Sequence, residues 1–91
     1  MEFVHDIVKK IGNVHKIHNG KFSSLDRCFF NIKKKEDNEL YEFMLKKNIF
    51  NNTAGDKPIY ELMVYNKPTE KWQELYDTDS KEEIINYISK I

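Results

Sequence analysis

Cysteine, arginine, proline and glycine are all scarce in this 91-residue chain, and long hydrophobic runs are missing. The single cysteine, Cys28, excludes an internal disulfide. Even the longer hydrophobic runs, such as Leu62-Met63-Val64, are short, whereas a membrane-spanning helix needs about 20 apolar residues. The sequence does not open with a basic segment followed by an apolar stretch, so we expect no secretory signal. These absences predict a cytoplasmic protein with no membrane span.

Residue patterns that carry chemistry are also sparse. The sequence has no Gly-rich phosphate loop, no nucleophile elbow and no paired-carboxylate motif. His15 and His18 are three residues apart, which places them on opposite faces of a strand, and Cys28 is the only soft metal ligand. We therefore expect a protein that is not an enzyme, with no cofactor and no bound metal.

The charged residues balance overall but not locally. Fifteen Lys and Arg offset fifteen Asp and Glu, with a net charge of +3 over residues 1–50 and −3 over residues 51–91. Arg27 is the only arginine, although arginine is the residue that makes planar forks with phosphates and bases. This composition favours a protein partner over nucleic acid. The abundance of Lys, Asn and Ile suggests an AT-rich genome, so we expect a bacterial cell or a phage-infected host.

Hydrophobic periodicity predicts a helix at each end of the chain. Apolar residues recur at helical spacing over residues 2–11, and Gly12 is placed to end that helix. Ser80-Lys81-Glu82-Glu83 has the capping-box pattern, with Asp79 as an alternative cap, and begins a helix that continues to Ile91.

Between the helices, alternation of apolar and polar residues predicts antiparallel strands. The segments with strand-like patterns are 14–18, 21–25, 28–34, 39–47, 59–65 and 72–77, and we expect four or five strands from them. Asn19-Gly20 is a strong signal for a two-residue hairpin turn, which would place Ile17 opposite Phe22.

The alternation also predicts which residues lie opposite one another in the two later hairpins. In the first, the expected pairs are Ile32 with Tyr41, Phe30 with Phe43, and Cys28 with Leu45. In the second, a loop at 67–70 gives the pairs Leu62 with Leu75, Met63 with Glu74, and Tyr65 with Trp72.

These elements predict a single α+β domain over residues 1–91. It would be a four- or five-stranded antiparallel meander with an N-terminal and a C-terminal helix packed on one face. The face under the helices would be aliphatic: Phe22, Cys28, Phe30, Ile32, Tyr41, Phe43, Leu45, Tyr60, Leu62, Val64 and Leu75. A register slip of one residue would exchange the two faces.

The opposite face would then be aromatic, with polar and acidic residues between the apolar side chains. Its expected residues are Phe29, Leu40, Met44, Ile59, Met63, Tyr65, Trp72 and Tyr76, with Asn31, Glu42, Glu61 and Glu74 among them. Exposed apolar patches of this kind often mark interaction sites, and Tyr and Trp are enriched at binding hot spots. Two blander interpretations remain open: Trp72 packs under the 48–57 loop, or against a second copy of the chain.

The sequence therefore favours a small non-enzymatic protein-binding module, an inhibitor or regulator of the antitoxin, immunity or phage anti-defence type. The acidic-aromatic face would bind a basic partner, such as a nucleic-acid-binding protein, through Met63, Tyr65, Trp72, Tyr76, Glu61, Glu74, Glu42, Met44 and Phe29. One alternative is a nucleic-acid-binding accessory protein that uses a lysine-rich edge of Lys33, Lys34, Lys35, Lys46 and Lys47. Another is a structural homodimer.

Overall fold

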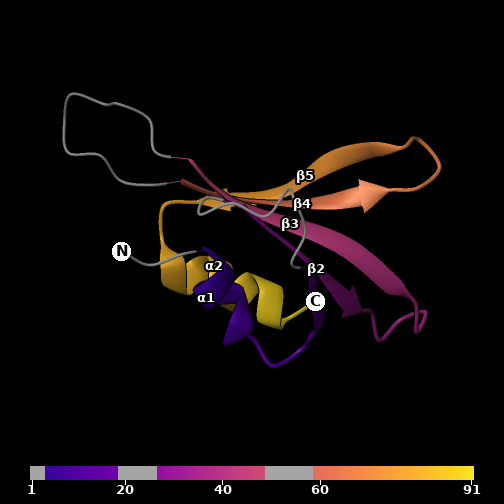
Figure 1. The fold of residues 1–91 in the computed structure, drawn as a ribbon, viewed down its shortest axis with the longest axis horizontal. Helices are drawn as coiled ribbons and strands as arrows, with labels where there is room; N and C mark the ends of the chain where they lie inside the picture. The colour runs from indigo at the N-terminus through magenta and orange to yellow at the C-terminus, as the bar shows by residue number, and fades with distance from the viewer. Residues whose placement is uncertain (1–3, 19–26, 49–58) are drawn as a thin grey trace.

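The computed structural model describes residues 4–18, 27–48 and 59–91. In chain order its elements are α1 (Val4–Lys9), β1 (Val14–His18), β2 (Arg27–Lys33), β3 (Leu40–Asn48), β4 (Ile59–Asn66), β5 (Lys71–Thr78) and α2 (Lys81–Ser89). The strands form one five-stranded sheet in the order β1-β2-β3-β4-β5, and each neighbouring pair is antiparallel. Both helices lie on one side of this sheet (Figure 1). The predicted α+β meander with its two helices is confirmed.

The main core lies between the sheet and the helices, on what we call the covered face. Alternate residues of the strands point there because successive side chains of a strand project to opposite sides. The core consists of Val4, Ile7, Val8, Ile11, Cys28, Phe30, Ile32, Phe43, Leu45, Tyr60, Leu62, Ile84 and Ile88. Of the predicted aliphatic face, Tyr41 and Val64 pack against this core as partly buried residues. Phe22 lies outside the described residues.

The hairpin of β2 and β3 has the predicted register throughout. Cys28 lies opposite Leu45, Phe30 opposite Phe43, and Ile32 opposite Tyr41. The Phe30 and Phe43 rings stack with their centroids 5.8 Å apart. This hairpin therefore supplies the centre of the core.

The hairpin of β4 and β5 departs from the predicted register at one point. Tyr65 lies opposite Trp72 and Met63 opposite Glu74, as predicted, but the register then shifts and Leu62 lies opposite Tyr76. Leu75 is thus the extra residue of a β-bulge, which turns every later side chain of β5 to the other face.

Two residue placements are corrected by this bulge. Leu75 was expected in the core opposite Leu62, but its side chain is 37% exposed. Tyr76 was expected on the uncovered face, but it packs against the core and its ring stacks on Tyr87 of α2, with centroids 4.5 Å apart.

At the other edge of the sheet, β1 pairs with β2. Ile17 lies opposite Phe30, and a register shift occurs between Val14 and Lys16. The predicted Asn19-Gly20 turn, the strand 21–25 and most of the 48–57 loop fall outside the described residues, so the pairing of Ile17 with Phe22 stays a prediction.

Helix α2 begins at the predicted cap. The Ser80 hydroxyl accepts a hydrogen bond from the Glu83 backbone N–H at 3.2 Å. The Glu83 carboxylate accepts from the hydroxyls of Thr78, at 2.6 Å, and Tyr76, at 3.4 Å, while Thr78 Oγ1 accepts from the Ser80 backbone N–H. The start of α2 is therefore fastened to the end of β5.

The end of α2 is held from the N-terminal part of the chain. The Asn13 side-chain amide, which follows α1, donates to the Ile88 carbonyl at 2.9 Å and to the Ile91 carbonyl at 3.5 Å. The Ile88 carbonyl also accepts from the Ile91 backbone N–H at 3.2 Å, so the Asn13 amide adds a tertiary hydrogen bond to a turn that is already closed locally.

Candidate functional site

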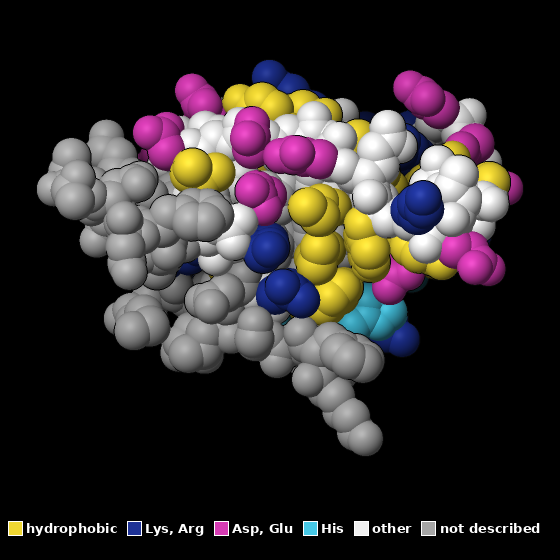
Figure 2. Space-filling model, turned by 90° about the horizontal axis from the view of Figure 1, so that it is seen from above, with side chains coloured by type: hydrophobic (Ala, Val, Ile, Leu, Met, Phe, Trp, Pro, Cys, Tyr) yellow, Lys and Arg dark blue, Asp and Glu magenta, His cyan; other side chains and the backbone are white. Residues whose placement is uncertain are grey.

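The side of the sheet opposite the helices, which we call the open face, is not covered by any helix or strand among the described residues. Figure 2 looks onto this face and shows hydrophobic side chains in a central band, with acidic side chains along one side. The strand registers place there Phe29 and Asn31 of β2, Leu40, Glu42, Met44 and Lys46 of β3, Glu61, Met63 and Tyr65 of β4, and Trp72, Glu74 and Asp77 of β5.

The aromatic residues of the open face pack on one another. The Trp72 ring lies edge-on to Tyr65, with centroids 5.3 Å apart, and tilted against Phe29, with centroids 5.7 Å apart. Phe29 and Trp72 belong to β2 and β5, which are separated by three strand spacings of about 4.8 Å each in a flat sheet. Their rings meet because the sheet curves and both side chains lean inward over β3 and β4.

The rings enclose a small second cluster. Met44 lies between them in strand order, opposite both Phe29 and Met63, and is only 7% exposed although it is not part of the main core. We call Phe29, Met44, Met63, Tyr65 and Trp72 the outer cluster. All except Met44 are partly buried. Met44 is therefore packed inside the outer cluster, whereas the rings at its rim keep exposed surface.

Charge on the open face is divided between its two sides. Acidic residues lie on β3, β4 and β5, at Glu42, Glu61, Glu74 and Asp77, whereas basic residues lie on β1, β2 and the end of β3, at Lys16, Arg27, Lys33 and Lys46. The acidic character predicted for the whole face is thus concentrated on β4 and β5, where Glu74 is two residues from Trp72 and the Glu61–Asp77 pair lies toward the other end of the ladder.

Asp77 belongs to this acidic side although the sequence analysis did not include it. It lies opposite Glu61, on the open face, because the bulge at Leu75 reverses the direction of every later residue of β5. The same reversal removes Tyr76 from the candidate binding residues. Burial, together with Glu83, raises the pKa of the Tyr76 hydroxyl.

A polar network borders the outer cluster. The Asn31 side chain donates to the Tyr41 carbonyl at 3.3 Å, and its Oδ1 lies 2.5 Å from His18 Nε2. His15 does not join His18, and the described residues contain no group of three or more His, Cys, Asp or Glu placed to hold a metal ion. The network fixes the orientation of the Asn31 side chain between β1 and β3.

The lysines of the alternative nucleic-acid site do not form one edge. Lys33 lies opposite Leu40 at one end of the β2–β3 ladder, while Lys46 lies opposite Arg27 at the other end. Six residues of strand separate the two ends, or about 20 Å. Lys34 Nζ lies 4.5 Å from the centroid of the Tyr41 ring, so this lysine also has a local packing role.

Cys28 is a buried free thiol in the main core, in agreement with its predicted place on the aliphatic face. Burial raises the pKa of this thiol to about 11, which keeps it protonated and unreactive at neutral pH.

None of the described helices combines the length and the apolar composition required to cross a membrane. Comparisons of the chain with protein-family models, with curated proteins and with solved structures give no match.

Proposed function

We propose that this chain is a small non-enzymatic protein-binding module, an inhibitor or regulator that binds a basic partner through the acidic side of its open face. The supporting observation is the combination at β4 and β5 of two mutually packed rings, Tyr65 and Trp72, with the carboxylates of Glu61, Glu74 and Asp77 on the same face. Partly buried Tyr and Trp beside polar groups are the usual composition of a binding hot spot.

Each part of this surface has a distinct role in the proposal. Trp72 and Tyr65 hold each other in fixed orientations, so little side-chain entropy is lost when a partner packs against them. Met63 supplies an adaptable apolar contact beside them. The carboxylates attract a basic surface and disfavour acidic ones, which increases the association rate and the specificity.

Antitoxins, immunity proteins and phage-encoded inhibitors of bacterial defence are the class to which we assign this module. The assignment is an analogy based on chain length, composition and surface type. It implies action inside a bacterial or phage-infected cell, on a basic protein such as one that binds nucleic acid.

The experiment that tests the proposal is capture of a partner by tagged protein from the lysate of a low-GC bacterial host. The wild type is compared with Tyr65→Ala/Trp72→Ala, with and without nuclease. We expect one stoichiometric protein that resists nuclease and is lost with the double variant. The single variant Trp72→Ala should weaken the purified complex by more than about 1 kcal/mol.

A matched variant, Lys33→Ala/Lys34→Ala/Lys35→Ala, separates this proposal from the nucleic-acid alternative. It should leave capture unchanged, because Lys33 ends β2, two strands from Tyr65 on β4 and three strands from Trp72 on β5, and Lys34 and Lys35 continue into the turn beyond it. Capture that disappears with the lysine variant or on nuclease treatment would contradict the proposal. Light scattering on the isolated protein, with Trp72→Ala beside it, tests for a homodimer joined through the same rings.

A further inference from the structure

The β2–β3 and β4–β5 hairpins separate from each other toward their tips. The pairing of β3 with β4 ends at Phe43 and Val64, although β3 begins at Leu40 and β4 continues to Asn66. Figure 1 shows the two hairpins diverging beyond this point. The facing segments, residues 40–42 and 65–66, pair with their outer neighbours β2 and β5 but not with each other. We call the opening between these segments the hairpin split.

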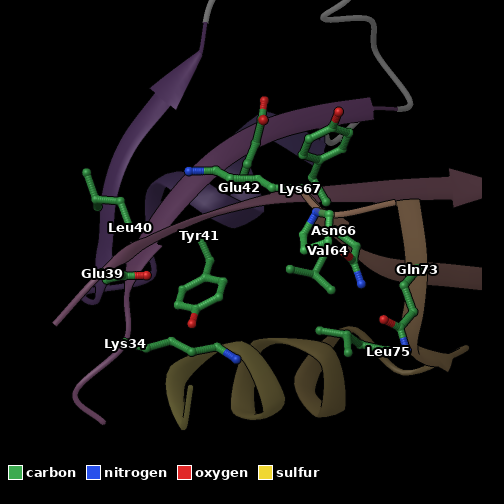
Figure 3. A pocket seen from close by; sticks show the side chains of 12 residues that line it. Lys34, Glu39, Leu40, Tyr41, Glu42, Val64, Asn66, Lys67, Gln73 and Leu75 are labelled. Carbon is green, nitrogen blue, oxygen red and sulfur yellow. The ribbon is translucent and has the colours of Figure 1, made fainter. Parts of the chain in front are cut away.

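A hollow of about 510 Å³ lies in the hairpin split. Figure 3 shows side chains of both hairpins around it, with Leu40 and Tyr41 on one side and Val64 and Leu75 on the other. Leu40 and Leu75 are the large hydrophobic residues that remain exposed in the described part of the chain, at 45% and 37%. The split therefore offers apolar contacts from two directions.

The edge of β3 that faces the split carries backbone groups without a strand partner. The Lys34 backbone N–H donates to the Glu39 carbonyl at 3.0 Å, which shows that Glu39 directs its carbonyl toward β2. Successive residues of a strand direct their backbone groups to opposite sides, so Leu40 and Glu42 direct theirs into the split. Because β4 pairs with β3 only from Phe43 onward, the N–H and C=O of Leu40 must bond to water or to a bound chain.

The outer edges of the sheet are less suited to pairing than this inner edge. Both outer strands contain a bulge, with His15 as the extra residue of β1 and Leu75 as that of β5. Bulges on outer strands disturb the regular spacing that a further strand needs, and natural sheets use them to prevent such pairing. The register of β3 with β2 is unbroken up to Leu40, so the edge at the split keeps regular geometry.

The side chains around the split fit the two faces of an extended segment. Tyr41 and Val64 lie on its covered side, where they pack against the main core. Leu40, Glu42 and Tyr65 lie on its open-face side.

The charges that line the hollow are balanced, with Lys34 and Lys67 against Glu39 and Glu42. Residues inside the split are therefore selected by shape and by backbone pairing, rather than by charge.

We propose that the hairpin split binds an extended apolar segment of the basic partner protein as an added strand, paired with β3 at Leu40 and Glu42. Addition of a strand to a free sheet edge is a common mode of peptide recognition. The inference rests on the function proposed above, because the split opens onto the open face beside Tyr65, and it specifies how the partner is held. Basic residues that flank the segment lie over the acidic side of the open face.

The test is a selection of displayed peptides on the purified protein. Five consecutive positions are varied among Val, Leu, Lys, Glu and Pro, and a fixed Lys-rich flank follows them. We expect the selected peptides to be rich in Val and Leu and poor in Pro, because Pro lacks the backbone N–H of an added strand.

Methylation of single backbone nitrogens in a selected peptide then identifies the N–H groups that bond to the protein. The Kd should rise at least tenfold at alternate positions and less than twofold at the positions between them. Only every second residue of a strand faces a given neighbour, so this alternation is specific to an added strand.

A matched pair of variants tests the edge of β3. Leu40→Pro removes the N–H that faces the split and leaves pairing with β2 intact, since Pro is tolerated at the first residue of a strand. Leu40→Ala keeps this N–H and removes only the side chain. We expect the peptide Kd to be at least tenfold higher for Leu40→Pro than for Leu40→Ala. Thermal unfolding checks both variants, and the methylation pattern on the wild type decides the question if Leu40→Pro fails to fold.

Capture of the partner separates this inference from the proposed function. If capture is lost with Tyr65→Ala/Trp72→Ala but retained with folded Leu40→Pro, the proposed function stands and the added strand is wrong. If capture is lost with Leu40→Pro alone, the added strand is supported and the role of the rings is wrong.

Three further outcomes would overturn the proposal. The first is a selection that yields no peptide above background. The second is a selected peptide whose affinity shows no alternation on methylation. The third is self-association of the free protein that Leu40→Pro abolishes, since that would assign the split to a second copy of the chain.

Discussion

The two hairpins that form most of the sheet differ in how regular they are. The β2–β3 hairpin has an unbroken register and places Phe30 and Phe43, both fully buried, at the centre of the core. The β4–β5 hairpin has a bulge at Leu75 and extends past the helices (Figure 1).

The turns of the two hairpins show the same contrast in backbone geometry, with the less favourable conformation in the β4–β5 turn. Each contains a residue with positive φ, Asn38 at 59° in the β2–β3 turn and Glu70 at 55° in the β4–β5 turn. Asn tolerates this conformation well, whereas Glu does not. Local departures from ideal geometry are thus concentrated in the hairpin that carries Tyr65, Trp72 and Leu75. The β2–β3 hairpin supplies the centre of the core, and the β4–β5 hairpin carries Tyr65 and Trp72 of the candidate binding surface.

Single-residue deletions should reveal the largest difference between the two hairpins in the free energy of unfolding. Deletion of Met44 from β3 should cost more than about 3 kcal/mol of unfolding free energy, because either Phe43 or Leu45 must then leave the core. Deletion of Leu75 should change it by less than about 1 kcal/mol, because Glu74 and Tyr76 keep their partners in a regular ladder. Urea unfolding measures both. Similar losses for the two deletions would mean that the bulge is not as described.

Replacing one aromatic residue in each hairpin with alanine should give the next largest difference in the free energy of unfolding. Phe43→Ala should lower the free energy of unfolding by about 3–5 kcal/mol, since it leaves a cavity in the main core. Trp72→Ala should lower it by only about 1–2 kcal/mol, because that ring is partly exposed and its aromatic contacts among the described residues are Phe29 and Tyr65. Equal losses would place Trp72 in the core and contradict its proposed role.

The Cys28 thiol makes the stability of the β2–β3 hairpin depend on pH. Burial raises the pKa of the thiol from 9.0 to about 11, so the folded state holds the proton more tightly than the unfolded state. The contribution is complete below about pH 9 and is lost as the pH rises toward 11. Urea unfolding of the wild type and Cys28→Ala at pH 8 and pH 10.5 should show a smaller difference at the higher pH.

Tyrosines also titrate in that range, so the difference between wild type and variant is the quantity to compare. Iodoacetamide provides an independent check, because it should label Cys28 only under unfolding conditions at neutral pH. Rapid labelling of the folded protein would show that the thiol is accessible.

The smallest expected changes in the free energy of unfolding come from substitutions in the two turns. Glu70→Gly should raise the free energy of unfolding by about 0.5–1 kcal/mol, because glycine adopts positive φ without steric cost. Asn38→Gly should change it by only a few tenths of a kcal/mol, since Asn already suits that conformation. Thermal unfolding of both variants beside the wild type measures the contrast. A loss of stability with Glu70→Gly would show that the Glu70 side chain makes a contact worth more than the strain.

Where both faces of a strand carried a consistent pattern, the sequence predicted the structure. The β2–β3 register followed from alternation because its core positions are apolar and Lys33, Asn31 and Glu42 point the other way. The bulge did not follow, because Leu75 and Tyr76 are both apolar and either could lie opposite Leu62. The choice is made by α2, where Tyr87 stacks on Tyr76 and Glu83 accepts from its hydroxyl.

The candidate sites were predictable only in part, for a similar reason. Alternation placed Phe29, Met63, Tyr65 and Trp72 on one face, but it could not show that Phe29 and Trp72 meet across the strands between them. That contact depends on the curvature of the whole sheet. The separation of β3 from β4 beyond the Phe43–Val64 pair also depends on tertiary packing, which no local pattern specifies.

The Asn13 amide has a consequence for the order in which the chain folds. It donates to the Ile88 carbonyl across 75 positions of sequence, and the entire meander lies between the two residues. The closure of such a long loop is entropically costly until the intervening strands have paired. Docking of α2 should therefore be a late event in folding, and its release an early event in unfolding. The Asn13 side chain is the group that connects the segment after α1 to the end of α2.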